Sequence, residues 1–357
     1  GQSVQMTIIP GLLLALVLAF AGQFLSKFIG IDLMGLPKSP ISAIMMAIIL
    51  GIIIRNTISL PASLQPGIRF GLVRVLRAGI VLLGIRLSLS EAGAIGLQAL
   101  PVIIGAVAAA LLIVTYLAKK MGLSGKLGTL IAVGTSICGA TAIVATAPTI
   151  AAKDDEVAYS VACITLFGVV AMLLYPFAGH LIFDGDAFKS GLFLGTAVHE
   201  TAQVAGAGLV YQQYYSDPQA LDVATVTKLV RNLGMLMIIP LMSILYHRNH
   251  SDGTEAPKWY TMIPLFVIGF ACMSLIRTVG DLNEEQAFGF LDPATWKSIV
   301  GHVKDAAELC LAVAMAAVGL GTSIKGLKDI GLKPLGAGLL AAVLVGGVSI
   351  TLISLLY

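Results

Sequence analysis

The sequence contains few charged residues. Asp, Glu, Lys and Arg make up 11% of its 357 residues, whereas an ordinary soluble domain carries roughly 25%. Hydrophobic residues make up 57%, and the mean hydropathy is +0.95. A surface with so few charges is poorly suited to water. The composition therefore excludes an ordinary soluble enzyme and indicates an integral membrane protein.

The sequence also lacks the features of several other classes of protein. Its net charge of +3 is spread over many loops, which excludes the concentrated basic patch of a nucleic-acid-binding protein. The four cysteines lie in apolar stretches without CxxC spacing, so neither a disulfide framework nor a zinc site is expected. No metal and no cofactor are predicted.

Apolar segments close to the ~20 residues needed to cross a bilayer recur along the chain. They predict an all-α polytopic membrane protein with about eleven transmembrane helices, and the polar connections between them are too short for a soluble domain. We therefore expect one integral-membrane domain over residues 1–357, with the lipid bilayer as its surroundings. The predicted spans are 7–28, 41–55, 72–88, 95–117, 127–151, 157–183, 187–212, 223–246, 260–279, 300–322 and 335–356.

Charges near the ends of these spans indicate an orientation. Lys119, Lys120 and Lys126 fall on one side of the membrane, whereas the acidic run from Asp154 to Glu156 falls on the other. Because cytoplasmic loops carry an excess of Lys and Arg, this bias predicts a cytoplasmic N-terminus.

An internal repeat is visible at an offset of 235 residues. This offset aligns Gly84 with Gly319 and Gly96 with Gly331, and it also matches several Ser, Ile, Leu and Ala positions around them. The two copies are an odd number of spans apart, so they are expected to run in opposite directions, as inverted repeats of secondary transporters do. The predicted halves are 41–183 and 187–357. The alternative is chance similarity between segments rich in Gly and Leu.

The segment 134–142 interrupts an apolar run with two glycines and several hydroxyl side chains. A helix broken at membrane depth is tolerated only against protein or a water-filled cavity, and the N-terminus of a half-helix favours an anion. The segment therefore predicts a discontinuous helix that binds substrate. Alternatively, it is a glycine-kinked packing helix whose hydroxyls bond to its own backbone. The candidate residues are Thr135, Ser136, Cys138, Gly139 and Thr141.

A second candidate segment, 195–208, places ionisable residues inside an apolar run. Ionisable groups at membrane depth are costly, so His199 and Glu200 are candidates for carrying a coupling proton. Gln203 lies one helical turn beyond His199 and is predicted to contact substrate. The alternative is a pair of residues satisfied by an interhelical hydrogen bond.

The third candidate segment, 225–234, carries Lys228, Arg231 and Asn232. The two cations lie three residues apart and thus on one helix face, where they could neutralise a carboxylate, sulfonate or sulfate, or pair with Glu200. Alternatively, both long side chains extend to the membrane interface.

These segments, together with the run from Tyr159 to Gly168, resemble the YeiH family (UPF0324) of bacterial inner-membrane proteins over essentially the full length. The resemblance implies a sulfate-exporter-type transporter in the clan of cation:proton antiporters and anion transporters. It also implies two inverted units whose discontinuous helices cross near the membrane centre.

The sequence therefore predicts a secondary transporter that couples a small anion, such as sulfate, a sulfonate or a carboxylate, to H+ or Na+. The alternatives are a passive anion channel and a cation/proton antiporter. An intramembrane hydrolase using Ser136 with His199, or Cys138, is not expected, because neither nucleophile has an evident base. A homodimer is compatible with these patterns.

Overall fold

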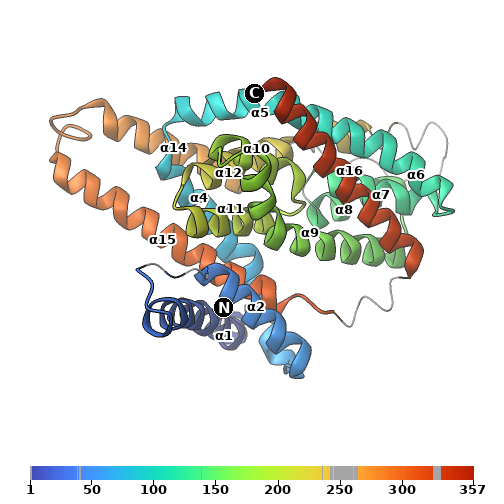
Figure 1. Cartoon of the computed structure of the whole chain (residues 1–357), viewed down its shortest axis with the longest axis horizontal. Coiled ribbons are helices and arrows are strands. Elements are labelled where there is room, and N and C mark those ends of the chain that lie inside the picture. The colour runs from blue at the N-terminus through green and yellow to red at the C-terminus, as the bar shows by residue number, and fades with distance from the viewer. Residues whose placement is uncertain are drawn as a thin grey trace. The chain divides into compact units, whose positions relative to one another are not determined.

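The computed structural model describes residues 2–37, 39, 42–137, 139–234, 236–241, 244, 260, 264–324 and 331–357. Within these ranges the secondary structure is helical apart from one isolated bridge between Ala287 and Leu291, so the predicted all-α class is confirmed (Figure 1). The chain divides into two compact units. Unit 1 comprises residues 1–94, 209–218 and 265–325, and unit 2 comprises residues 95–208, 219–264 and 326–357.

Unit 1 is built from long helices joined by short helical segments. α2 packs against both α1 and α15, and α15 also packs against α4. The close approach of α2 to α15 occurs where Gly51 faces Gly319, because a Cβ at either position would overlap the backbone of the other helix. The helices of unit 1 are α1 (Gln2–Lys27), α2 (Ala43–Thr57), α3 (Gln65–Phe70), α4 (Leu76–Leu83), α14 (Leu265–Leu282) and α15 (Pro293–Leu320).

Unit 2 contains all three candidate segments. α10 packs along α12, and α16 contacts both α7 and α9 (Figure 1). The core between α7, α9 and α16 is apolar and contains Leu130, Ile164 and Ala341, each fully buried. The helices of unit 2 are α5 (Leu89–Ala109, beginning in unit 1), α6 (Thr115–Lys120), α7 (Gly125–Ser136), α8 (Ala140–Thr146), α9 (Asp154–Ile182), α10 (Ala187–Ala197), α11 (Thr201–Tyr215, ending in unit 1), α12 (Gln219–Leu233) and α16 (Leu332–Leu356).

Helix starts follow local sequence rules. The side chain of Ser124 accepts a hydrogen bond from the Leu127 N–H at the start of α7, and Asp186 does the same for the Lys189 N–H at the start of α10. Each short polar side chain thereby satisfies one main-chain donor that has no partner within the helix.

Each predicted span overlaps a described helix, but among the described residues six helical segments are both long and apolar enough to cross a membrane. The difference from eleven has a physical reason. Two predicted spans are interrupted, so neither of their halves is long enough, and charged residues in its first half make α15 less apolar. The shorter apolar helices are Ala43–Thr57 and Ala140–Ile150. The six long segments are Thr7–Leu33, Leu89–Lys120, Asp154–Ile182, Gln219–Leu241, Leu265–Leu282 and Leu332–Leu356.

Candidate functional site

Two helices in unit 2 are interrupted. α7 ends at Ser136 and α8 begins at Ala140, and we call residues 137–139 the first break. α10 ends at Ala197 and α11 begins at Thr201, and we call residues 198–200 the second break. Both interruptions fall inside segments that the sequence singles out for their polar residues.

The first break contains a glycine with an unusual backbone conformation. Gly139 has φ +65° and ψ −128°, a conformation that residues with a side chain rarely adopt. Its N–H donates to the carbonyl of Gly134 at 2.9 Å, which closes the end of α7. The sequence-predicted glycine at this position therefore has a conformational role.

The second break is extended and is closed by a side chain. Val198 has φ −85° and ψ 141°, which ends α10. The Glu200 N–H donates to Gln203 Oε1 at 3.1 Å, and Gln203 Nε2 donates to the carbonyl of Thr165 at 3.0 Å. Gln203 thus caps the start of α11 and ties it to α9.

Arg231 of α12 connects the two breaks. Its guanidinium donates to the carbonyls of Thr135 at 2.8 Å and Ser136 at 3.2 Å in α7, and to those of Gly195 at 2.8 Å and Val198 at 2.9 Å at the end of α10. The residue is 1% exposed. These carbonyls lie at helix ends, where main-chain acceptors lack partners and carry partial negative charge. A buried charge is therefore balanced by main-chain dipoles.

Lys228 makes the same kind of connection one helical turn earlier. Its ammonium donates to the carbonyls of Ile137 in the first break and His199 in the second. Lys228 is also 1% exposed, so its side chain ends inside the protein. The two cations predicted to face one way do so, and their described hydrogen bonds reach main-chain carbonyls.

Two hydroxyl groups of the first segment, which the sequence predicts to bind substrate, form hydrogen bonds within the protein. Thr135 Oγ1 donates to the carbonyl of Ile131 at 2.8 Å, and Ser136 Oγ donates to that of Val133 at 3.1 Å. Thr141 is exposed on α8, and Cys138 lies outside the described residues. At this segment the groups that meet the cations are main-chain carbonyls, while the two buried hydroxyls bond within their own helix.

Glu200 lies beside the first break although it belongs to the second. Its Oε1 accepts a hydrogen bond from Thr165 Oγ1 at 3.1 Å, and its carboxylate interacts favourably with the Ala140 N–H and with Lys228. Sequence reasoning did not single out Thr165. The available signal was its place in the 159–168 run that carries part of the family resemblance.

Several buried polar atoms around the second break have no hydrogen-bond partner within the described part of the chain. They are both ring nitrogens of His199, Asn232 Oδ1 and Thr227 Oγ1, on residues that are 0–2% exposed. The Thr135 carbonyl interacts with the imidazole without completing a hydrogen bond of standard geometry. Asn232 is held at the start of α11 by donating from Nδ2 to Thr201 Oγ1 at 3.1 Å. Such atoms are expected to need a polar partner.

The charges at the breaks favour an anion. Lys228 and Arg231 contribute two positive charges and Glu200 contributes one negative charge, so this cluster carries a net positive charge while Glu200 is ionised. No group of three or more His, Cys, Asp or Glu residues that could hold a metal ion occurs in the part of the chain that the structure describes. The arrangement suits electrostatic binding of an anion and proton exchange at Glu200.

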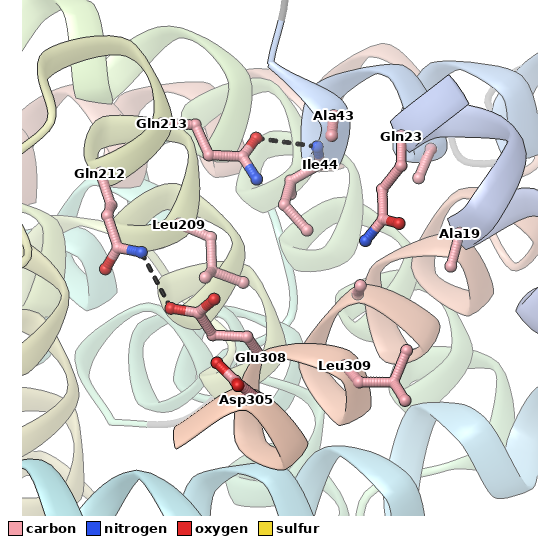
Figure 2. Close-up of a pocket in the computed structure, with 12 residues that line it drawn as sticks. Ala19, Gln23, Ala43, Ile44, Leu209, Gln212, Gln213, Asp305, Glu308 and Leu309 are labelled. Carbon is pink, nitrogen blue, oxygen red and sulfur yellow. Dashed lines mark hydrogen bonds between the residues drawn. The ribbon is translucent and has the colours of Figure 1, made fainter. Parts of the chain in front are cut away.

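Unit 1 contains a separate polar cavity of about 160 Å³ (Figure 2). Asp305 and Glu308 of α15 lie on one side of it, and Gln212 Nε2 donates to Glu308 Oε1 at 3.0 Å. Across the cavity Gln213 Oε1 accepts from the Ile44 N–H at 3.0 Å, which caps α2. Among the described lining residues the charged ones are Asp305 and Glu308, while Arg86 donates from outside this set to Gln212 Oε1 at 3.2 Å.

Comparisons with known proteins agree with the full-length resemblance. Residues 10–338 match the family described as "Conserved hypothetical protein 698". A UPF0324 membrane protein of Fusobacterium nucleatum is 33% identical over 337 residues, covering 92% of each chain. One from Streptococcus pyogenes is 34% identical, covering 97% of this chain and 95% of its own, and one from Pseudomonas aeruginosa is 33% identical, covering 94% and 90%. No solved structure matches.

Proposed function

The chain belongs to the UPF0324 family of membrane proteins, and from that premise we propose that it is an ion-coupled secondary transporter for a small anion. The substrate class we propose is sulfate, a sulfonate or a carboxylate, and the coupling ion is H+ or Na+. The transporter operates in the bacterial inner membrane, with its N-terminus in the cytoplasm.

The observation that carries this proposal is the meeting of two helix breaks at Arg231 and Lys228. Main chain that leaves a helix at membrane depth needs partners that lipid does not supply, and buried cations there are costly to keep. Discontinuous helices whose ends face ions or charged substrates are a recurring solution in secondary transporters. Because the cations bond to carbonyls, we assign them the role of holding both breaks and supplying positive potential to the substrate.

The ion-coupling role falls to Glu200, with His199 beside it. The Glu200 carboxylate accepts a hydrogen bond from Thr165 Oγ1 at 3.1 Å, so it has a defined position beside the first break. Ser136 is assigned no nucleophilic role, since its hydroxyl donates to the Val133 carbonyl. The proposed anion site includes the ends of both breaks, Gln203 and Asn232.

The eleven spans and the inverted repeat form part of the proposal. Both compact units draw on both predicted halves, 41–183 and 187–357, as interleaved repeats do. One segment of unit 1 ends at residue 94 and another ends at residue 325. Adding the repeat offset of 235 to residue 94 gives residue 329, close to the second of these boundaries. In the first copy α4 of unit 1 is followed by α5, which begins in unit 1 and continues into unit 2, and in the second copy α15 of unit 1 is followed along the chain by α16 of unit 2.

The test is transport by the purified protein in liposomes. Uptake of radiolabelled sulfate, methanesulfonate and succinate is measured with an inward H+ gradient, an inward Na+ gradient, or neither. Accumulation above the equilibrium level under one gradient supports a coupled transporter and excludes a passive channel. Flux that is unchanged in a Glu200→Gln and Lys228→Ala double variant would remove the two breaks from the mechanism.

A cation/proton antiporter is a second candidate, and the acidic cavity of unit 1 favours it. Asp305 and Glu308 would attract a cation, since they are the charged side chains among the described residues that line this cavity. In liposomes loaded with a pH-sensitive dye, Na+ or K+ added outside should then drive proton movement without any permeant anion. A Glu308→Gln variant should reduce this signal, whereas an anion transporter should give none.

A further inference from the structure

The Glu200 carboxylate lies where hydrogen-bond donors are available that could equally bind an external anion. Thr165 Oγ1 donates to it at 3.1 Å, and the Ala140 N–H faces it. Gly139 leaves the space that the side chain fills, because a Cβ there would overlap Glu200 Cγ. A hydroxyl and a main-chain N–H directed at a carboxylate form a small anion-binding site that the protein fills with its own side chain.

The charged groups facing this carboxylate come from one neighbouring helix. Lys228 of α12 acts on it directly, Arg231 lies on the same face of α12, and His199 adjoins it in the chain. α8 and α9 contribute the Ala140 N–H and Thr165, and no ionised group among their described contacts with Glu200. Lys228 and Arg231 stabilise one negative charge at this site. An ionised Glu200 carboxylate and a second anion bound beside it would repel each other.

Polar atoms without a described partner lie on residues that flank Glu200 in the chain or bond to its neighbour. His199 precedes Glu200, and Asn232 bonds to Thr201, which follows it. Both ring nitrogens of His199 and Asn232 Oδ1 are buried and have no hydrogen-bond partner among the residues that the structure describes. An oxyanion carrying a proton, or water travelling with it, would find both donors and acceptors here. These atoms are therefore a second set of polar groups at the second break, besides the Glu200 contacts, that could take a polar partner.

We propose that Glu200 is a built-in competitor of the transported anion. Ionised, its carboxylate holds the Thr165 hydroxyl and the Ala140 N–H. When a proton from the aqueous phase binds to a carboxylate oxygen, the neutral acid releases these donors and an external anion takes them. This inference rests on the proposed function and deepens it by naming the coupling ion and the competing group.

The proton balance determines the direction of coupling. The loaded site contains one anion and one proton on Glu200, and the empty site contains neither, with Glu200 ionised. Anion and proton therefore move in the same direction, as symport. For a monovalent anion the charge of the site is equal in both states, so transport is insensitive to membrane potential, whereas a divalent anion with one proton moves net charge.

The experiment compares the apparent KM for anion at several pH values in the reconstituted full chain. Whichever of sulfate, methanesulfonate or succinate is transported serves as the probe. Wild-type KM should rise roughly tenfold per pH unit once Glu200 is ionised, because proton and anion binding are linked. In Glu200→Gln, which mimics the neutral acid, KM should be independent of pH. Downhill flux should remain, and a pH gradient should no longer drive accumulation.

The matched control is Glu285→Gln, which removes an exposed carboxylate in unit 1 and should leave the wild-type pH profile unchanged. Coupled wild-type flux with a pH-independent KM, or Glu200→Gln flux still driven by a pH gradient, overturns the competition while the transporter proposal stands. Absence of wild-type flux for all three anions overturns both. If Glu200→Gln does not fold, the wild-type KM profile alone decides.

Discussion

The two breaks of unit 2 solve the same problem by different local means. In the first break the chain turns at Gly139, which adopts a positive φ. In the second break the chain is extended at Val198, and the side chain of Gln203 caps the helix that follows. Yet both direct their free carbonyls to the same two cations, Lys228 and Arg231. Local conformation is thus specific to each break, while charge compensation is shared through α12.

The largest expected effect comes from removing the shared cation. Arg231→Met leaves four main-chain carbonyls without their buried donor, so the free energy of unfolding should fall by on the order of 3–5 kcal/mol. Arg231→Lys should recover only part of it, because an ammonium lacks the planar fork that reaches both breaks. Chemical unfolding in detergent, followed by circular dichroism, measures this.

Lys120→Gln is the control for Arg231, because Lys120 is exposed and contacts the Tyr116 ring. Its loss should cost less than about 1 kcal/mol. Equal losses of unfolding free energy in Arg231→Met and Lys120→Gln would contradict the proposed stabilisation of the breaks by Arg231.

A smaller effect, confined to the first break, is expected from Gly139→Ala. The backbone conformation strains any residue with a Cβ, at a cost of roughly 1–3 kcal/mol, and the methyl group displaces Glu200. Stability and coupled flux should therefore fall together. Gly125→Ala is the control, since nothing lies within 4 Å of a Cβ there and the position is at the start of α7. It should be neutral or slightly stabilising.

The second break is tested by Gln203→Leu. This variant leaves the Glu200 N–H without its acceptor and removes the bond that ties Gln203 to the Thr165 carbonyl, which should cost about 1–2 kcal/mol. Gln23→Leu removes an exposed glutamine in unit 1 and should change stability by about 0.5 kcal/mol or less. If Gln203→Leu costs as little as the control, the side-chain cap does not maintain the second break.

The smallest effect is expected at a hydroxyl. Because Ser136 Oγ donates within α7 while its carbonyl meets Arg231, Ser136→Ala should change stability by about 0.5 kcal/mol or less. The KM for anion should stay within about twofold of the wild-type value, since the proposal gives this hydroxyl no substrate contact. A large rise in KM in the flux assay would instead place it on the substrate.

Much of this arrangement could be predicted from residue types. Glycines and hydroxyls inside an apolar run indicated the first break, whereas ionisable residues inside another marked the segment of the second break without predicting that its helix stops there. The pattern could not reveal that Arg231 contacts carbonyls, because main-chain acceptors at a helix end have no signature in the sequence. Thr165 was missed because one threonine in a long apolar helix resembles any other residue that bonds to its own backbone.

The number of spans illustrates the same limit. Hydropathy marks apolar stretches, and each predicted range does contain a helix, but it does not detect where a helix stops and restarts within a stretch. The lengths of α7, α8, α10 and α11 depend on the backbone angles at Gly139 and Val198 and on the capping by Gln203.

By itself the sequence determined the all-helical membrane class, the family, and the segments where charge and glycine enter apolar surroundings, because these follow from composition and local order. Only the tertiary structure decided which atoms meet. Glu200 of one break reaches Thr165 and the other break, and α12 brings two cations to the ends of α7 and α10. Those pairings join residues about 30 to 100 positions apart, and they depend on how whole helices pack.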